Sequence, residues 1–362
     1  MLLRYSLTQK RFSSTAHHVI LEKIKNVGLI TINRPKQLNA MNWTMGSLIN
    51  KQLKIWENDS NISSIIIKND KSSNAFCAGG DIKVVRDCIA SGDYAYTLEC
   101  IKGLYTFYYN ISKLKKPYVA LINGITMGGG IGLSIHGKYR VATEKTVVAM
   151  PETAIGFFPD VGAAFELTRL EGKLGLYLAL TGARLRGKEV YDTGIATHFI
   201  NSSNVDELLN ELQSNEKADN VGIVLNKFNS GPRSKYPLDK INETFEADSV
   251  ENIIKNLVKD NSDWSVKQLK VLSKMSPTSL MVTFEQFRLT SAQTLKEVFE
   301  LDYQLAHRFI WEKDFPEGVR AQVVDKDNRP DWNPKTINGI SREKLAYFFT
   351  HLNSDDKLNL ES

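Results

Sequence analysis

Hydrophobic residues between Val27 and about Ile200 occur in short runs that alternate with longer stretches of helical periodicity. Four of the short runs have the composition of β-strands. Between the first two runs, apolar residues recur every three or four positions from Met45 to Trp56, which predicts a helix with one buried face. This alternation predicts an α/β core with mostly buried strands. The four runs are Val27–Ile32, Ser64–Lys68, Tyr118–Ile122 and Val147–Met150.

The pattern changes near residue 205, where the chain becomes richer in Asn, Lys, Glu and Ser. Strand signals are few in this part, and helical stripes predominate. The segment Arg329–Pro334, with the sequence RPDWNP, is typical of a turn-rich segment docked on the protein. The second half is therefore predicted to be helical. One of its stripes consists of Val250, Ile253, Ile254, Leu257 and Val258.

The segment Tyr118–Ile135 has no charged residue over 18 positions, which is the minimum length of a membrane-spanning helix. It contains five glycines together with Asn123, Thr126 and Ser134. Glycine is costly inside a helix, and the polar residues interrupt any surface that could face lipid. A buried strand, a glycine turn and a buried helix fit this segment better, and we expect no membrane span.

A length of 362 residues allows two compact units, or one large unit with an extension. Hydrophobic residues make up 42% and charged residues 24%, which excludes a disordered chain, a collagen-like repeat and a coiled-coil rod. Three cysteines (Cys77, Cys88 and Cys100) are too few to stabilise a chain of this size by disulfides, and no CxxC pair could hold zinc. The composition indicates a reducing compartment.

The first fourteen residues are basic and rich in hydroxyl groups, and they contain no acid. These properties are typical of a mitochondrial presequence, whereas a secretory signal needs a longer apolar centre. Removal of Arg4, Lys10 and Arg11 would lower the formal net charge from +5 to +2. Most of the basic character is therefore expected to serve targeting rather than binding of nucleic acid.

These observations predict three regions along the chain. A presequence is expected over residues 1–17, an α/β core over residues 18–204, and a helical C-terminal region over residues 205–362.

Several familiar site motifs fail on inspection. Ser134 and His136 lie in the run GLSIHG, where the second glycine is displaced from the GxSxG pattern of serine hydrolases. The glycines at 128, 129, 130 and 132 do not satisfy GxGxxG, because Leu133 and Ile135 occupy the positions that would need glycine. No GKS or GKT, HExxH or EF-hand sequence is present, and the six histidines are scattered. The sequence therefore predicts no metal, phosphate-loop or dinucleotide site.

Three other segments place small or acidic residues where a predicted strand ends: Ala75–Ile82, Gly124–Gly132 and Met150–Gly162. Backbone without side chains can approach a ligand closely, and the amides at the start of a helix have no partner inside that helix. Two such amides from separate turns can bind one oxygen as an oxyanion hole. Each segment taken alone is also explained by tight packing, so the combination carries the prediction.

Together, these segments resemble the crotonase (enoyl-CoA hydratase/isomerase) superfamily, and more closely its 3-hydroxyisobutyryl-CoA hydrolase branch. The resemblance extends over roughly residues 18–340, and the FFPD and SIHG elements are specific to the branch. It implies a ββα spiral core, a helical C-terminal region (residues 205–362) that closes the active site, and an acyl-CoA substrate. The runs that carry the resemblance are TINRPKQLNAMN, FCAGGDI, GITMGGGIGLSIHG, ATEKTVVAMPETAIGFFPDVG, KMSPTSL and DFPEGVRAQVVDKD.

The resemblance also implies roles for individual residues. The backbone amides of Ala78 and Gly129 would hold the thioester carbonyl. Hydratases of the superfamily use two glutamates, but Gly132 stands at the first of these positions here. The hydrolase branch instead uses the pair that corresponds to Glu152 and Asp160. Glu152 would attack the thioester or activate water, and Asp160 would position water or the substrate hydroxyl.

One position departs from the branch. Its members carry an EEY or DEY element ahead of the strand KPYVALI, whereas this chain reads KGLYTF. Leu104 stands where the second acid, which contacts substrate, is expected. The departure puts substrate choice and the rate of turnover in doubt.

The leading hypothesis is a thioester hydrolase of the mitochondrial matrix that acts on 3-hydroxyisobutyryl-CoA in valine breakdown. CoA belongs to the substrate, so no cofactor and no metal are expected. Two alternatives stay open: an isomerase that uses Glu152 alone, and a non-catalytic component of the small subunit of the mitochondrial ribosome. We expect an acyl-CoA as partner, no membrane span, and no nucleic acid unless the protein associates with the ribosome. The sequence leaves the oligomeric state open.

Overall fold

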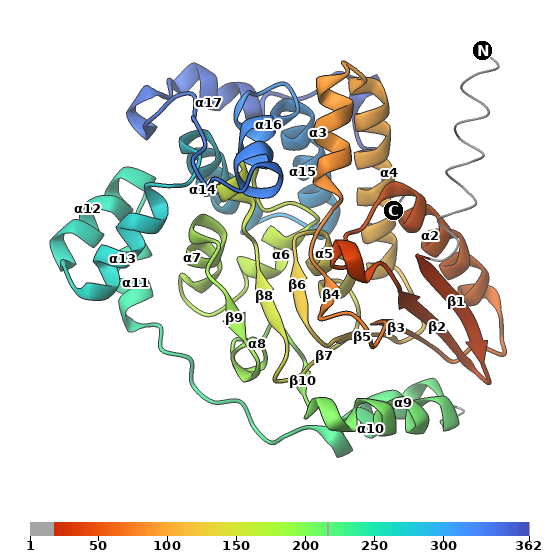
Figure 1. Cartoon of the computed structure of the whole chain (residues 1–362). Helices are drawn as coiled ribbons and strands as arrows, with labels where there is room; N and C mark the ends of the chain where they lie inside the picture. Colours follow the sequence, from red (N-terminus) through yellow and green to blue (C-terminus); the bar gives the residue numbers. More distant parts are fainter. Residues whose placement is uncertain (1–17, 216, 362) are drawn as a thin grey trace, which may run out of the picture. The chain divides into compact units, whose positions relative to one another are not determined.

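The computed structural model describes residues 18–215 and 217–361, so the expected presequence at 1–17 lies outside the described residues. The chain forms two compact units, and each is assembled from segments that are separate in the sequence (Figure 1). Of the described residues, unit 1 comprises 18–80 together with Thr106–Val148 and Leu185–Lys235. Unit 2 comprises Asp81–Tyr105, Ala149–Arg184 and the residues from Tyr236 onward.

Unit 1 is built on a six-stranded sheet with the strand order β1-β2-β3-β5-β7-β10. The first two strands form an antiparallel pair, and the remaining neighbours are parallel. All residues of β2 and β5 are buried, as expected of parallel strands that are covered on both faces. The strands are β1 (Val19–Ile24), β2 (Val27–Ile32), β3 (Ser64–Asn69), β5 (Tyr118–Ile122), β7 (Tyr139–Ala142) and β10 (His198–Phe199).

Helix α2 (Trp43–Asn58) confirms the helix predicted between the first two runs. It begins at Asn42, whose side chain accepts a hydrogen bond from the amide of Met45. Its buried residues include Met45, Ile49, Leu53 and Trp56, all of which belong to the predicted stripe. The sequence pattern thus identified both the helix and the face that it buries.

Three further helices of unit 1 come after β7 in the sequence: α8 (Lys188–Asp192), α9 (Val205–Ser214) and α10 (Val221–Phe228). Apolar residues of α9 and α10 form one hydrophobic core with residues of β2, β3, β5 and β7. The structure therefore differs from the expected boundary at 204/205, because these two helices cover the sheet of unit 1. The helical periodicity of the sequence alone could not show against which surface these helices pack. The core residues from the two helices are Leu208, Leu209, Leu212, Val221, Val224 and Leu225.

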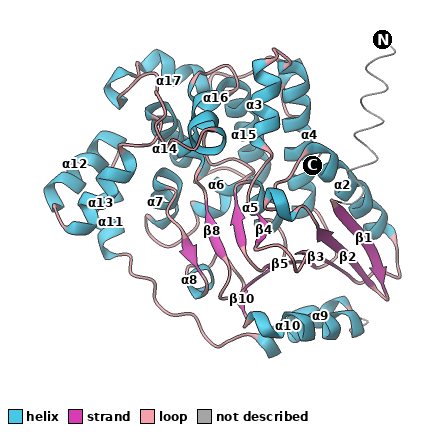
Figure 2. Cartoon of the chain, viewed as in Figure 1, coloured by secondary structure: helices cyan, strands magenta, loops and turns pink. Residues whose placement is uncertain are grey.

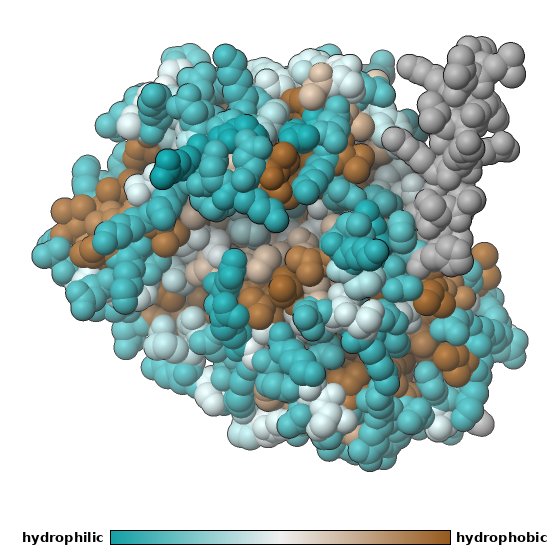
Figure 3. Space-filling model, in the orientation of Figure 1, coloured by the Kyte–Doolittle hydropathy of each residue, from teal (hydrophilic) through white to brown (hydrophobic). Residues whose placement is uncertain are grey.

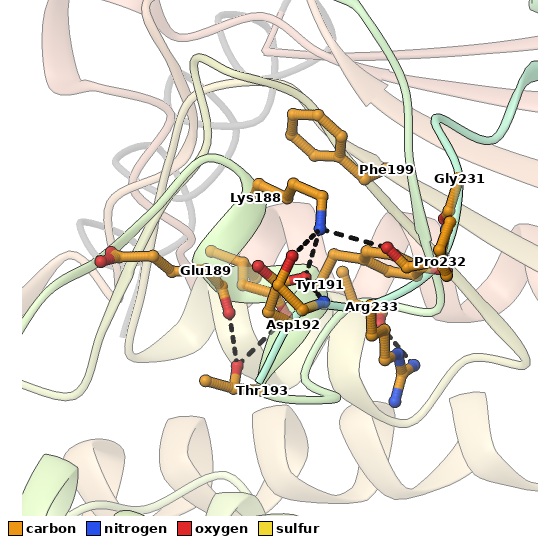
Figure 4. Close-up of polar contacts among 12 residues, drawn as sticks. Lys188, Glu189, Tyr191, Asp192, Thr193, Phe199, Gly231, Pro232 and Arg233 are labelled. Carbon is orange, nitrogen blue, oxygen red and sulfur yellow. Dashed lines mark hydrogen bonds and ion pairs between the residues drawn. The ribbon is translucent and has the colours of Figure 1, made fainter. Parts of the chain in front are cut away.

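The last segment of unit 1 is held on α8 by a group of polar contacts (Figure 4). The Lys188 ammonium donates to Asp192 Oδ1 at 2.5 Å and to the Pro232 carbonyl at 3.2 Å. The Arg233 guanidinium lies 5.0 Å from the centre of the Tyr191 ring, within range of a cation–π interaction. These contacts fix the chain just before it leaves unit 1.

A second sheet has the strand order β4-β6-β8-β9, and its strands are two or three residues long. They are β4 (Ala75–Cys77), β6 (Ile125–Met127), β8 (Val147–Ala149) and β9 (Leu185–Arg186). The uncharged segment Tyr118–Ile135 therefore forms β5, a turn, β6 and the buried helix α5 (Gly129–Ile135), which confirms the predicted strand, turn and helix. Among the described residues, no helix is long and apolar enough to cross a membrane.

Unit 2 is mainly helical, and its described residues from Tyr236 onward contain helices and loops but no strand (Figure 2). This confirms the helical second half that the sequence predicted. In the predicted stripe of α12, Val250, Ile253 and Leu257 are buried, whereas Val258 is 59% exposed. Trp332 of the predicted docked segment is buried and donates to the Lys274 carbonyl at 3.0 Å.

The α-helices of unit 2 commonly begin with a side-chain cap, as in α15, where Thr294 and Glu297 form a capping box. Helix α4 starts in unit 2, and its residues from Thr106 onward belong to unit 1. The helices are α3 (Ile82–Ala90), α4 (Tyr94–Ser112), α6 (Ala163–Leu167), α7 (Leu174–Thr181), α11 (Asp239–Phe245), α12 (Val250–Asp260), α13 (Asp263–Leu272), α14 (Pro277–Thr290), α15 (Leu295–Phe309), α16 (Asp314–Val319) and α17 (Arg342–Phe349).

Hydrophilic residues cover most of the face shown in Figure 3, and hydrophobic residues appear between them in separate groups. The large apolar side chains that are most exposed come from different elements: Ile55 from α2, Ile223 from α10, Val258 from α12, and Trp311 from the segment after α15. Single exposed apolar residues are normal for a globular protein.

Candidate active site

Glu152 opens the short 3-10 helix η2 (Glu152–Ile155), directly after β8 and Pro151. The turn is held in place because the Ser276 amide donates to the Thr153 carbonyl at 3.0 Å. At its end, Gly156 has a φ of +70°, and a Cβ there would lie 2.2 Å from the Asp314 carbonyl oxygen. Only glycine fits this position. These contacts thus fix the backbone position from which the Glu152 side chain extends.

The Glu152 side chain is a buried acid. Its residue is 6% exposed, and within the described part of the chain Oε2 is buried without a hydrogen-bond partner. Burial raises the pKa of Glu152 well above its usual value, and the negative charge of Asp160 raises it further. A buried carboxyl oxygen without a hydrogen-bond partner lowers the stability of the fold. Such oxygens are found where a side chain must act on a ligand.

Asp160 follows eight residues later, in the turn from Pro159 to Gly162. The Tyr105 hydroxyl, at the end of the unit 2 part of α4, donates to Asp160 Oδ2 at 2.7 Å. Burial raises the pKa of Asp160 to about 6, and the hydrogen bond from Tyr105 partly offsets this rise. Asp160 is therefore mostly ionised at neutral pH and can accept a proton.

The two carboxyl groups form an electrostatically coupled pair within unit 2, because the charge of Asp160 favours the protonated form of Glu152. Such a pair titrates as a unit, and its two carboxyl groups lose their protons in separate steps. One member can then act as base or nucleophile while the other supplies a proton. The structure thus gives a physical basis for the pairing that the resemblance implied.

Two residues that the sequence reasoning missed contact the turn that carries Asp160. Asp302 on α15 accepts a hydrogen bond from the Gly162 amide at 2.7 Å, and Gln286 on α14 donates to the Pro159 carbonyl at 2.9 Å. Both side chains are completely buried. Tyr105 was also missed, although it lies beside Leu104 in the run that departs from the branch. No local sequence signal connects these residues with Asp160.

The glycine turn of unit 1 brings several backbone groups together. Gly129 is the first residue of α5, and a Cβ on it would lie 2.9 Å from the Tyr108 hydroxyl oxygen and 3.2 Å from the Gly80 amide nitrogen. A Cβ on Gly130 would lie 2.1 Å from the Cys77 carbonyl oxygen. The glycine run therefore allows the start of α5 to pack directly against the loop after β4.

The structure distinguishes between the candidate amides of this loop. The Ala78 amide donates to the Leu38 carbonyl at 3.0 Å, so it is used inside unit 1. In the described residues, by contrast, no hydrogen bond is donated by the backbone amide of Gly80 or of Gly129. The backbone amide of Gly80 is thus available for a ligand, whereas that of Ala78 is not, and Gly80 lies close to Gly129.

Other predicted features can also be located. Gly132 is buried within α5, so no carboxylate extends from the position that hydratases use. Leu104 lies on α4 and is partly buried. Among the described residues, no group of three His, Cys, Asp or Glu side chains could hold a metal ion. Cys77, Cys88 and Cys100 form no disulfide with one another or with another described residue.

Comparisons with known proteins identify the family of this chain. The family described as enoyl-CoA hydratase/isomerase matches residues 27–349. The mitochondrial 3-hydroxyisobutyryl-CoA hydrolase of Homo sapiens is 44% identical, and the match covers 97% of this chain and 93% of the human protein. The protein of the same description from Xenopus tropicalis is 45% identical, with coverage of 98% and 96%.

Solved structures confirm the expected crotonase-like α/β fold. A carnitinyl-CoA dehydratase from Mycobacterium thermoresistibile has a TM-score of 0.88 at 32% identity, and the match covers 95% of this chain and 99% of that one. An enoyl-CoA hydratase from Rhodobacter sphaeroides has a TM-score of 0.85 at 31% identity, with coverage of 95% and 100%. The chain therefore belongs to the enoyl-CoA hydratase/isomerase family, in the branch of the 3-hydroxyisobutyryl-CoA hydrolases.

Proposed function

We propose that the protein hydrolyses 3-hydroxyisobutyryl-CoA to the free acid and CoA, and that it does so in the mitochondrial matrix as a step of valine breakdown. The observation that carries the proposal is the coupled pair of Glu152 and Asp160, combined with a glycine at position 132. A pair of this kind can cleave a thioester, whereas water addition in the hydratases needs the second glutamate. The names of the relatives from human and frog support the same substrate and compartment.

In this proposal, the amides of Gly129 and Gly80 donate hydrogen bonds to the thioester carbonyl oxygen as negative charge develops on it. Gly80 takes the place that the resemblance gave to Ala78, because the Ala78 amide already donates to Leu38. Removing one donor of an oxyanion hole typically costs ~2.7–4 kcal/mol of transition-state stabilisation. Two amides held by tight backbone packing are therefore a substantial part of the expected catalysis.

The carboxylates then divide the remaining chemistry. The ionised form of Glu152 is the reactive one: it either attacks the carbonyl carbon to form a mixed anhydride, which water then hydrolyses, or removes a proton from the attacking water. In both routes the C–S bond breaks and the sulfur leaves with its electron pair. In the direct route the sulfur receives the proton that Glu152 took from the attacking water. In the anhydride route it receives a proton from a water molecule, and the hydroxide that remains hydrolyses the anhydride. Asp160 positions water or the substrate hydroxyl. A single turnover in ¹⁸O-labelled water distinguishes the routes, since only the anhydride route can place label in the Glu152 side chain.

The test of the proposal is release of free CoA thiol from 3-hydroxyisobutyryl-CoA by the purified protein. Glu152→Gln and Asp160→Asn should each lower kcat by roughly 10²–10⁴-fold, the range of general acid–base catalysis. Glu285→Gln is the matched control, because Glu285 makes an ion pair with Arg288 at the surface. Absence of hydrolysis by the unmodified protein would overturn the function. Equal rates in all variants would overturn only the assignment of the site.

The structure gives little support to a role in the ribosome. The densest basic run is Lys113–Lys116, and its members make contacts within unit 1. The Lys116 ammonium donates to the Trp56 and Asp59 carbonyls, and the Lys113 ammonium lies 5.8 Å from the centre of the Tyr109 ring. Binding of RNA phosphates would need basic groups that are free to reach them.

A further inference from the structure

The turn that carries Asp160 has an unfavourable backbone. Val161 has a φ of +58° and Gly162 a φ of +73°, so two consecutive residues are in the left-handed region. For a β-branched residue such as valine this conformation is rare, because its Cβ crowds the neighbouring carbonyl. A turn of this kind persists only where the surrounding structure holds it.

Asp302 and Gln286 supply the contacts that hold this turn. Asp302 Oδ2 accepts a hydrogen bond from the Gly162 amide at 2.7 Å, on the C-terminal side of Asp160. Gln286 Nε2 donates to the Pro159 carbonyl at 2.9 Å, on the N-terminal side. Gln286 Nε2 also donates to Asp302 Oδ1 at 2.8 Å, so the two side chains are joined to each other.

Packing alone does not require a polar side chain at either of these two positions. Both are 0% exposed, on helices α14 and α15, where apolar residues of similar size would pack without a desolvation cost. Burial and the neighbouring Asp160 charge both raise the pKa of Asp302, which means that an acid at this place is costly for the fold. The cost is explained if the pair performs a task at the turn.

We propose that Asp302 and Gln286 are positioning residues that hold the left-handed turn at Val161–Gly162 and thereby direct the Asp160 carboxylate. The proposal rests on the proposed function, because it assigns the pair a role in the same hydrolysis. Tyr105 fixes one oxygen of the carboxylate from α4, but this hydrogen bond has the correct direction only if the backbone of the turn stays in place. Asp302 and Gln286 themselves need not touch substrate.

The test is a double-mutant cycle on hydrolysis. Asp302→Asn keeps the shape of the side chain but cannot accept from both the Gly162 amide and Gln286. We expect kcat to fall about 10–100-fold with KM changed less than twofold, as for a group that acts on the transition state. In the Asp160→Asn background, Asp302→Asn should lower kcat by less than twofold, because its effect passes through Asp160.

Asp260→Asn is the matched control in unit 2, since this acid holds Ser262 and Ser265 at the start of α13 and pairs with Lys240. It should leave kcat unchanged. Gln286→Met gives a second route to the same answer if Asp302→Asn does not fold. An unchanged kcat in both folded variants, or the same fold-loss in both backgrounds, would overturn the proposal.

A readout without catalysis separates this proposal from the proposed function. Hydrogen–deuterium exchange of the peptide that contains Gly162 should become at least tenfold faster in Asp302→Asn and stay unchanged in Asp260→Asn. Unchanged exchange in Asp302→Asn would overturn the positioning role, even for a protein without thioesterase activity. Faster exchange in a protein that hydrolyses no 3-hydroxyisobutyryl-CoA would instead contradict the proposed function and leave the hold on the turn supported.

Discussion

The Tyr105 hydroxyl donates a hydrogen bond of 2.7 Å to Oδ2 of Asp160, from a residue 55 positions earlier in the chain. The bond stabilises the ionised carboxylate, which burial disfavours, and the balance raises the pKa of Asp160 to about 6. A hydroxyl that helix α4 presents thus adjusts the acidity of a group in a distant turn.

Tyr105→Phe should raise the pKa of Asp160 above its present value, because the hydrogen bond that favours the ionised form is lost. A hydrogen bond to a charged group contributes about 1.5–3 kcal/mol, and one pKa unit corresponds to about 1.4 kcal/mol. The acidic limb of the pH–rate profile should therefore move about one unit toward higher pH. Tyr347→Phe is the control, since the hydroxyl of Tyr347 is bonded to Arg308 at the surface. Superimposable acidic limbs would contradict the role of Tyr105.

Glu152→Gln should stabilise the protein at neutral and alkaline pH while it lowers kcat by roughly 10²–10⁴-fold. The folded pKa of Glu152 lies above the unfolded value near 4.5, so between these two values the folded state binds more protons. Stability is then lost as the pH rises through this window. Glutamine removes the effect, and urea unfolding should show a higher free energy of unfolding than the parent at pH 8 and little difference at pH 4. A variant less stable than the parent at pH 8 would contradict the burial of an ionisable group here.

Leu104→Glu should raise the preference for an acyl group that carries a hydroxyl. The carboxylate would accept a hydrogen bond from that hydroxyl, and a contribution of about 1.5 kcal/mol corresponds to about tenfold. The measurement is the ratio of kcat/KM for 3-hydroxyisobutyryl-CoA to that for isobutyryl-CoA. Leu104→Gln should raise the ratio less, since its amide oxygen is the weaker acceptor. An unchanged ratio in both variants would show that position 104 does not contact the acyl group.

Gly129→Ala and Gly130→Ala should have different consequences, although they change neighbouring residues. The methyl group at 130 would meet the Cys77 carbonyl at 2.1 Å, where only backbone could yield, so we expect little folded protein. At 129 the Tyr108 hydroxyl and the Gly80 amide would have to move by tenths of an ångström. We therefore expect a folded protein with kcat lowered roughly 10²-fold, as for a damaged oxyanion hole.

Circular dichroism and the rate of thiol release measure both outcomes. Adding Tyr108→Phe to Gly129→Ala removes the closer obstacle and leaves the contact with Gly80. If activity stays low in the double variant, the Gly80 amide is the group that matters. Full activity of Gly129→Ala alone would exclude this turn from the reaction.

The sequence predicted those parts of the fold that depend on local patterns. Strands β2 and β5 have the predicted bounds, because a fully buried parallel strand is a continuous apolar run. Strands β9 and β10 have two residues each, which is too short for any periodicity. The packing of α9 and α10 on the sheet could not be predicted either, since an amphipathic stripe does not identify its partner.

The prediction of the candidate site was limited in the same way, because the sequence pattern could connect only residues that are close together in the chain. Glu152 and Asp160 are eight residues apart in a recognisable run, so the sequence could propose them together. Tyr105 and Asp302 are joined to this turn only by folding, across 55 and 140 positions. The amide of Ala78 was proposed from its position in a motif, but its hydrogen bond to Leu38 depends on a separate loop.

The discontinuous make-up of unit 2 has a consequence for synthesis. Its first two segments, 81–105 and 149–184, leave the ribosome long before residues 236–361, which supply most of its helices. Until then Phe157 and Phe158 lack Phe309 and Phe315, the rings that they contact in the finished protein. A nascent or prematurely terminated chain would expose these aromatic side chains, and such surfaces promote aggregation. Shortened products of this gene should therefore depend on chaperones or be degraded, even when they contain both Glu152 and Asp160.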